Sequence, residues 1–250
     1  MGKIQLEKCR NVRDICYGDI KEKHLLRSAV LSDLSEDDIR ILTKTYNLKT
    51  VIDLRTEEER AVPDVEIPGV KNIPISLLAA ATQGITHEMT LEEKMAFYQE
   101  NLPDLADLYK VMVYPNTKPQ WQQIFDIFLN NEEGAILWHC AEGKDRCGLV
   151  SAMIEYCLGI DMKTIMADYL MTNEVAEGRA RMMYELVMEY EGDLEKAQHT
   201  YDEYVAKEEY LNGAFDYIYE TYGSIDNFLK EICGVDETKR EILKKKYLYE

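Results

Sequence analysis

The sequence lacks closely spaced cysteine pairs, long apolar runs and an excess of basic residues. No two cysteines form a Cys-x-x-Cys pair, so a zinc knuckle is not expected. No segment approaches the roughly 18 consecutive apolar residues of a membrane span. Lysine and arginine together number 29 against 47 aspartates and glutamates, which gives a net charge of −18. Such a chain is not expected to bind nucleic acid in general or an anionic membrane, because both favour a basic surface.

The first residues lack the features of a targeting segment. Lys3 and Glu7 stand where a secretory signal needs an apolar run, and Leu6 stands where the myristoylation pattern needs serine or threonine. We therefore expect a soluble protein of the cytoplasm, in which the six cysteines stay reduced rather than forming a disulfide framework.

The composition supports a substantial core without a visible internal boundary. The chain has 250 residues, of which 46% are hydrophobic, and this excludes a disordered chain. No repeat, low-complexity tract or Pro/Gly/Ser-rich linker divides it. We therefore expect a single domain over residues 1–250.

Strand and helix patterns alternate along the first part of the chain. Residues 48–54, 70–75 and 134–139 are short and rich in aliphatic and β-branched side chains, as buried strands are. Ser35 is placed to cap a helix that runs to about Tyr46. This alternation predicts an α/β fold with a central, mostly parallel sheet flanked by helices.

Two further regions are expected to be helical. Residues 77–118 look like a lid-like insertion, in which residues 90–93 form a capping box and Pro103 interrupts the helix that follows. Residues 149–250 have a helical pattern and hold most of the tyrosines, which we interpret as core and interface packing.

The segment from His139 to Gly148 carries the residue types of phosphoryl chemistry. It reads His-Cys-Ala-Glu-Gly-Lys-Asp-Arg-Cys-Gly, follows a predicted buried strand and precedes an apolar helical run. A loop in that context turns its backbone N–H groups inward at a helix N-terminus and binds anions. Gly143 and Gly148 permit the tight backbone that such a loop needs. His139 is expected to be a buried hydrogen-bonding residue behind the cysteine.

Cys140 and Arg146 are predicted to act together on a phosphate held in this loop. The N–H groups and Arg146 favour the thiolate of Cys140, which is a nucleophile toward phosphorus. The planar guanidinium of Arg146 holds two phosphate oxygens at once. The pattern predicts phosphoryl transfer through a cysteinyl-phosphate. The loop residues between the two are expected to contact the substrate: Ala141, Glu142, Gly143 and Lys144.

This segment resembles the His-Cys-x5-Arg loop of the protein tyrosine phosphatase superfamily. Its Gly-Lys-Asp-Arg core resembles the bacterial branch typified by the mycobacterial tyrosine phosphatase B. Further segments resemble that branch and extend the likeness over most of the chain: residues 11–15, 26–29 with Leu34, 51–55 with Glu58, 168–170 with 172–173, and 222–225.

The resemblance implies a two-step reaction in which Cys140 takes the phosphoryl group and water then releases it. It implies no metal and no cofactor. The implied substrate is a phosphotyrosyl protein or another phosphomonoester, and the loop is expected to bind phosphate, sulfate and vanadate.

The resemblance also implies a general acid inside the loop, which is Asp145 in this chain. No Trp-Pro-Asp tripeptide, the usual context of an acid on a separate mobile loop, is present. A structural salt bridge is the alternative role for Asp145, and Asp53, at the end of a predicted strand, is the second candidate acid. Arg27, Arg55 and Lys144 are candidates for a positive rim that contacts the substrate, or each is a solvated charge or ion-pair partner.

Cys147 departs from the family pattern, which has threonine or serine after the arginine. A thiol is a weaker donor than a hydroxyl, so breakdown of the phosphoenzyme is expected to be slow. Cys147 is either a tolerated small residue or a redox partner for Cys140.

Three functions fit these residues. The first is a protein tyrosine phosphatase, including one of dual specificity. The second is a phosphatase for phosphoinositides or other small phosphates. The third, of another class, is a catalytically silent phospho-binding module, and the presence of both Cys140 and Arg146 weighs against it.

Overall fold

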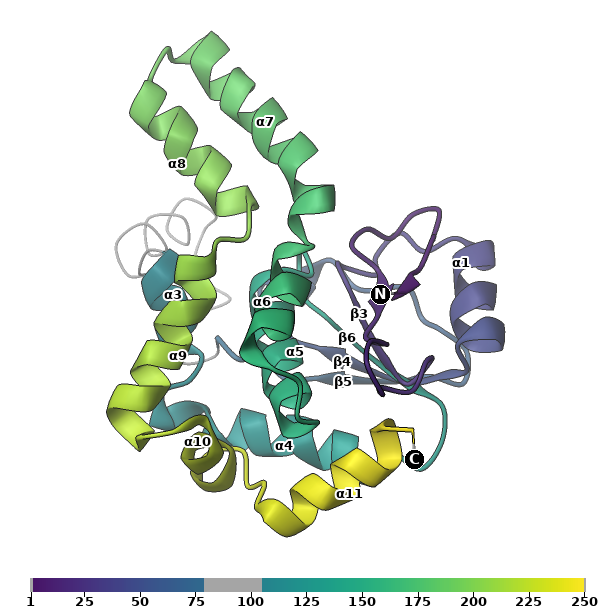
Figure 1. The fold of residues 1–250 in the computed structure, drawn as a ribbon. Coiled ribbons are helices and arrows are strands. Elements are labelled where there is room, and N and C mark those ends of the chain that lie inside the picture. Colours follow the sequence, from purple (N-terminus) through teal and green to yellow (C-terminus); the bar gives the residue numbers. More distant parts are fainter. Residues whose placement is uncertain (1, 79–104, 250) are drawn as a thin grey trace.

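A mixed sheet of six strands lies at the centre of the protein (Figure 1). The computed structural model describes residues 2–78 and 105–249. In their order across the sheet, the strands are β1 (Gly2–Lys3), β2 (Arg13–Asp14), β3 (Leu25–Ser28), β6 (Ala135–His139), β4 (Leu48–Asp53) and β5 (Lys71–Pro74). Strands β3, β6, β4 and β5 run parallel, and β1 and β2 extend the edge of β3 through antiparallel pairs. This arrangement confirms the predicted α/β class.

The three strands predicted from the sequence are β4, β5 and β6, and their observed bounds fall inside the predicted ranges. Aliphatic and β-branched residues favour such extended segments. Strands β4 and β6 are buried as expected, but β5 is mostly exposed because it is the edge strand of the sheet. The prediction missed β1, β2 and β3. These strands have only two to four residues, which is too short to display an alternating pattern.

Side chains of the central strands alternate between two hydrophobic cores, one on each face of the sheet. Leu25, Ile136 and Trp138 join the larger core, which also contains residues of α4 and α5. Their chain neighbours Leu26 and Leu137 point the other way into a smaller core. The central strands β3 and β6 are therefore buried on both faces, as expected for parallel strands.

Helices cover both faces of the sheet (Figure 1). On the side of the smaller core, α1 (Glu36–Arg40) continues into one π-helical turn over Ile41–Thr45. Ser35 caps α1 as predicted: its side chain accepts a hydrogen bond from the backbone N–H of Asp38, and the Asp38 carboxylate accepts one from the N–H of Ser35.

A short 3-10 helix spans Glu59–Ala61, and the other described α-helices lie after residue 104. They are α3 (Leu105–Val111), α4 (Lys118–Asn130), α5 (Asp145–Cys157), α6 (Met162–Leu170), α7 (Asn173–Tyr190), α8 (Leu194–Tyr204), α9 (Glu208–Tyr222), α10 (Ile225–Glu231) and α11 (Glu237–Tyr247). Asp161, Asp193, Ser224 and Asp236 cap four of them by accepting a hydrogen bond from a backbone N–H of the first turn.

The expected lid-like insertion at residues 77–118 falls mostly on residues 79–104, which lie outside the described residues, as do the capping box at 90–93 and Pro103. The described end of this region forms α3 and a 3-10 turn over Pro115–Thr117.

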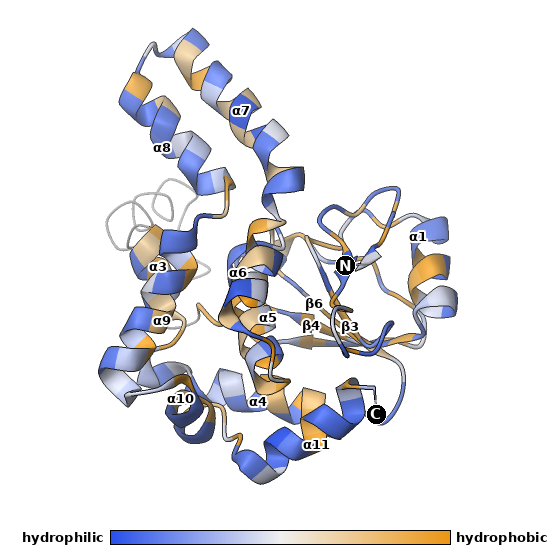
Figure 2. Cartoon of the chain, in the orientation of Figure 1, coloured by the Kyte–Doolittle hydropathy of each residue, from blue (hydrophilic) through white to orange (hydrophobic). Residues whose placement is uncertain are grey.

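Helices α7 and α8 form a hairpin that projects from the rest of the molecule (Figure 1). Figure 2 shows that hydrophilic residues dominate both of its helices, which agrees with their exposure to solvent. Among the described residues, none of the helices has the length and apolar character needed to cross a membrane.

Candidate active site

The segment that links β6 to α5 has its carbonyl groups turned outward toward fixed donors. Each of the four carbonyl oxygens of residues 141–144 accepts a hydrogen bond from outside the segment. The Val30 N–H donates to the Ala141 carbonyl at 3.2 Å. Asn11 Nδ2 donates to the carbonyl oxygens of Glu142 (3.1 Å) and Gly143 (3.0 Å). Arg27 Nη2 donates to those of Gly143 (2.8 Å) and Lys144 (3.3 Å).

Because a peptide N–H points opposite to its carbonyl group, the backbone N–H groups of this segment face away from those donors. Within residues 2–78 and 105–249, no oxygen atom accepts a hydrogen bond from the N–H groups of residues 141–146. The last of these N–H groups belong to the first turn of α5, where helical N–H groups have no partner inside the helix. The arrangement is an anion-binding nest.

Gly143 and Gly148 are required by the packing of this nest. Gly143 has a φ of +67°, and a Cβ atom there would lie 2.6 Å from the carbonyl group of Ser28. A Cβ atom on Gly148 would lie 2.7 Å from the ring of Tyr169. The two glycines therefore let the loop approach β3 on one side and α6 on the other.

Cys140 lies at the base of the nest and is only 1% exposed. Its pKa is lowered to about 6, chiefly by a hydrogen bond from the Cys147 side chain, with contributions from the charge of Arg146 and the backbone N–H of Cys147. Burial and the charge of Asp145 oppose this shift without cancelling it. Cys140 is therefore mostly a thiolate at neutral pH, which is the nucleophilic form.

The Cys147 side chain is the largest cause of the lowered pKa of Cys140. Burial and the hydrogen bond to Cys140 raise the pKa of the Cys147 thiol well above its usual range, so it keeps its proton and remains a donor. Its Sγ atom also lies 3.7 Å from the carbonyl oxygen of Ser28 and 3.8 Å from that of Trp138. A hydrogen bond to a charged acceptor is stronger than one to a carbonyl oxygen. The Cys140 thiolate is therefore the preferred acceptor for the Cys147 thiol.

Arg146 is held in place by Glu59, which the sequence analysis did not single out. Its Nη2 donates to Glu59 Oε1 at 2.7 Å, its Nη1 pairs with Glu59 Oε2, and Nη1 lies 3.4 Å from the carbonyl oxygen of Leu54. Burial raises the pKa of Glu59, but hydrogen bonding and the charge of Arg146 outweigh it and the pKa is lowered. Thr56 fixes Glu59 in turn, through a backbone N–H that donates to Oε2 at 2.7 Å.

Asp145 occupies the first turn of α5, and its side chain is 20% exposed. Its Oδ1 accepts a hydrogen bond of 2.8 Å from the hydroxyl of Tyr109 on α3 and lies 3.3 Å from the ammonium of Lys144. The Tyr109 hydroxyl lies 2.7 Å from that of Tyr169 on α6. The predicted general acid therefore stands beside Arg146 and is oriented by a buried pair of tyrosines.

A tyrosine phosphatase family model matches residues 4–249, almost the whole chain. The chain belongs to the tyrosine phosphatase family. A tyrosine-protein phosphatase of Nostoc commune is 26% identical over 224 residues, covering 88% of this chain and 72% of the relative. The triple specificity protein phosphatase PtpB of Mycobacterium tuberculosis is 35% identical over 110 residues, which are 41% of this chain and 40% of the relative.

The family membership and these relatives identify the chain as a protein tyrosine phosphatase, a hydrolase that acts on a phosphorylated substrate. The crystal structure of the core catalytic domain of the PP-IP phosphatase SIW14 from S. cerevisiae is similar over 67% of this chain and 78% of that chain, with a TM-score of 0.39 and 15% identity.

Asp53, the second candidate acid of the phosphatase, lies in a buried ion-pair cluster. Its two carboxylate oxygens accept hydrogen bonds from Arg55 at 3.0 and 2.8 Å, and Arg55 also pairs with Asp64 at 2.8 Å. His139 Nε2 is 3.0 Å from Asp64 and 3.7 Å from Asp53. Asp53, Asp64 and His139 could together ligate a metal ion, but the Arg55 guanidinium already pairs with both carboxylates and would repel a cation.

The three cations expected to form a positive rim are buried instead, because each is paired with acceptors inside the protein. Arg27 is 0% exposed and donates to Asp168 and Ser151 as well as to the loop carbonyls. Lys144 donates to the carbonyl oxygen of Glu203 at 2.6 Å. Arg55 lies in its own cluster with Asp53 and Asp64, so of the three cations only Arg27 binds the loop carbonyls.

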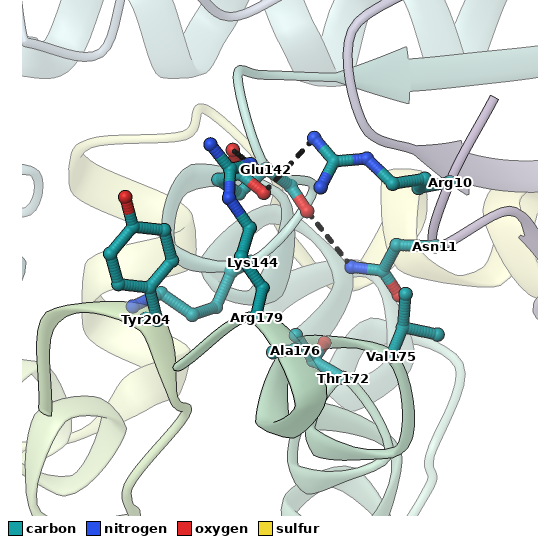
Figure 3. Close-up of a pocket in the computed structure, with 9 residues that line it drawn as sticks. All are labelled: Arg10, Asn11, Glu142, Lys144, Thr172, Val175, Ala176, Arg179 and Tyr204. Atoms are coloured by element: carbon teal, nitrogen blue, oxygen red, sulfur yellow. Dashed lines mark hydrogen bonds and ion pairs between the residues drawn. The ribbon is translucent and has the colours of Figure 1, made fainter. Parts of the chain in front are cut away.

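The exposed cations near the loop are Arg10 and Arg179, which were not predicted. Both pair with Glu142, at 3.4 and 2.8 Å, and Arg179 lies over the ring of Tyr204 at 5.1 Å from its centroid. Figure 3 shows these side chains around a small pocket that also involves Asn11. Glu142 thus points away from the nest and ties the outer side of the loop to the α7–α8 hairpin.

Proposed function

We propose that this protein tyrosine phosphatase works through a cysteinyl-phosphate on Cys140 and belongs to the branch typified by the mycobacterial enzyme PtpB. The observation that supports this most directly is the thiol whose pKa is lowered to about 6, which lies beneath a loop whose carbonyl groups all face outward. A thiolate and a phosphate nest at the same place are what attack on phosphorus needs.

In the first step, the nest and the Arg146 guanidinium bind the phosphate oxygens, and Glu59 holds the guanidinium in orientation. The thiolate sulfur of Cys140 forms a bond to phosphorus while the bond from phosphorus to the leaving oxygen breaks. Asp145 gives its proton to that oxygen, so an alcohol or phenol departs rather than its anion.

In the second step, water attacks the cysteinyl-phosphate and Asp145, now ionised, takes a proton from it. The sulfur–phosphorus bond breaks, which releases inorganic phosphate and restores the thiolate. Cys147 stabilises this thiolate as it leaves, because its thiol donates to the Cys140 sulfur. No step in this scheme requires a metal ion or a cofactor.

The proposed substrate is a phosphotyrosyl protein, with activity on further phosphorylated residues. The 35% identity to a phosphatase described as having triple specificity supports the broader range. We also propose that residues 1–250 form one phosphatase domain, with residues 77–118 as a lid-like insertion and residues 149–250 as a helical part, and that the enzyme acts in the cytoplasm.

The covalent route is tested with Cys140→Ser. The variant should lose turnover while still binding vanadate or phosphate, because the nest does not depend on the sulfur. Residual hydrolysis within tenfold of the parent enzyme would contradict the covalent route. Activity should also survive EDTA, and a complete loss that zinc or magnesium restores would contradict the metal-free scheme.

The substrate class is tested with matched phosphotyrosyl and phosphoseryl peptides and with inositol phosphates, at equal concentrations and with phosphate release as the readout. A clear preference for phosphotyrosyl peptides, with measurable release from phosphoseryl peptides, is expected. A preference for inositol phosphates would instead favour the small-phosphate alternative.

A further inference from the structure

The carboxylate of Asp145 is bound on one of its two oxygens only. Oδ1 accepts from the Tyr109 hydroxyl at 2.8 Å and lies 3.3 Å from Lys144 Nζ. For Oδ2, the described part of the chain provides no hydrogen-bond donor. The two oxygens of this carboxyl group are therefore in different environments.

The tyrosines that hold Oδ1 form a rigid, buried pair. Tyr109 is 0% exposed and Tyr169 is 1% exposed, and their rings meet edge to face with centroids 6.1 Å apart. A third ring, that of Tyr210 on α9, lies 6.0 Å from Tyr109 on another side. The Tyr109 hydroxyl therefore has little freedom to leave its position against Asp145.

When Asp145 is ionised, the hydroxyl protons of Tyr109 and Tyr169 can be arranged in only one way. A carboxylate only accepts, so Tyr109 must donate its single proton to Oδ1. The remaining hydrogen bond at 2.7 Å is then a donation from the Tyr169 hydroxyl to the Tyr109 oxygen. Burial raises the pKa of both tyrosines, so both keep their protons and remain donors across the working pH range.

We propose that Tyr109, supported by Tyr169, is a positioning residue for the general acid: it occupies Oδ1 so that the catalytic proton is carried on Oδ2 of Asp145. This rests on the proposed role of Asp145. A proton on Oδ1 would displace the Tyr109 donation and reverse the direction of both hydrogen bonds, whereas a proton on Oδ2 leaves them intact. The tyrosines thus select the oxygen that delivers the proton to the leaving group.

The test compares Tyr109→Phe with the parent on a series of aryl and alkyl phosphates whose leaving groups range from acidic to weakly acidic. The variant should lose about tenfold in kcat/KM on poor leaving groups, the size of a lost hydrogen bond to a charged group. Its kcat/KM, which reports the first step alone, should change less than twofold on the most acidic phenols, which need no protonation, and its affinity for inorganic phosphate should stay the same. Tyr169→Phe should show a smaller loss of the same form.

Two comparisons make the result specific. Tyr222→Phe removes a hydroxyl that bonds the Val113 carbonyl just beyond α3 without touching Asp145, so it controls for general loosening of that segment and should leave the series unchanged. In an Asp145→Asn background, Tyr109→Phe should have no further leaving-group effect, because the group it positions is absent.

Equal losses across the series for Tyr109→Phe, or losses that add to those of Asp145→Asn, would overturn the proposal and leave the tyrosines as a structural link between α3 and α6. A flat series for Asp145→Asn would also overturn it, by assigning the acid elsewhere. That result is distinct from failure of the covalent route, which is judged by Cys140→Ser alone.

Discussion

Glu59 and Arg146 form a two-point ion pair at the edge of the phosphate nest, with Arg146 Nη2 donating to Glu59 Oε1 at 2.7 Å. The Arg146 guanidinium stays charged in this pair, and the two contacts fix the orientation of its plane. The backbone N–H of Thr56 in turn holds the Glu59 carboxylate. Because a guanidinium binds phosphate through a planar fork, its orientation matters as much as its charge.

Replacing Glu59 with glutamine should lower kcat/KM about tenfold to a hundredfold, the range of a hydrogen bond between charged groups converted to a rate. The affinity for vanadate should fall as well, because the free enzyme no longer holds Arg146 in its binding orientation. The matched control is Glu66→Gln, at an exposed position with the same change of charge. Equal behaviour of the two variants would show that Glu59 does not position Arg146.

The reactivity of Cys140 should follow a pKa of about 6. The thiolate is the form present above that pH, so alkylation by iodoacetamide should be fast at pH 7 and should slow as the pH falls through 6. In Cys147→Ala, the largest cause of the lowered pKa is removed, and the midpoint should move upward by about one pH unit or more. An unchanged midpoint in this variant would show that the backbone N–H groups and Arg146 are enough to lower the pKa of Cys140.

The loop was predictable from the sequence because its chemistry is local. Ten consecutive residues, from His139 to Gly148, contain the nucleophile, the guanidinium, the candidate acid and the glycines. The flanking strand and helix were also readable, since β6 is a run of aliphatic residues and α5 an apolar helical one. The fold class and the proposal of Cys140 and Arg146 as the reactive pair needed nothing further.

The supporting residues were not predictable, because they reach the loop from distant parts of the chain. Glu59 is 87 positions from Arg146, and Tyr109 is 36 positions from Asp145. Glu59 carried one weak signal, since Thr56 and Glu59 have the spacing of a capping box. Nothing marked Tyr109 among 17 tyrosines, and Tyr169 stood only within a segment that resembles the family branch. The burial of Arg27 could not be predicted from the sequence for the same reason, because its partner Asp168 lies 141 positions away.

Gly143→Ala should reduce both stability and vanadate binding, and the steric clash of the new Cβ atom should contribute more than the positive φ alone. The residue has a φ of +67°, and the added Cβ would stand 2.6 Å from backbone atoms of Ser28, which cannot rotate away. We expect a lower melting temperature and a loss of vanadate binding of at least tenfold. Gly159→Ala is the matched control: it also has a positive φ but has open space around its Cβ position, so it should lower the melting temperature and leave vanadate binding unchanged.

Cys140 and Cys147 are free thiols in hydrogen-bond contact, and this places a second sulfur beside the nucleophile. Peroxide oxidises the Cys140 thiolate to a sulfenic acid, and attack by the Cys147 sulfur then forms a disulfide and releases water. That bond would protect Cys140 from irreversible over-oxidation, and a thiol such as dithiothreitol would reverse it by exchange.

After mild peroxide treatment, the parent enzyme should recover most of its activity with dithiothreitol, whereas Cys147→Ser, measured against its own starting activity, should recover several-fold less. Mass analysis of the oxidised parent should show a peptide that joins Cys140 to Cys147. A buried pair only seven positions apart satisfies the first requirement of such a bond, proximity, but a disulfide also demands Cα atoms within roughly 4.4–6.8 Å of each other. Equal recovery of the two proteins, or the absence of the joined peptide, would mean that the backbone does not meet this demand and that Cys147 serves only as the donor to the thiolate.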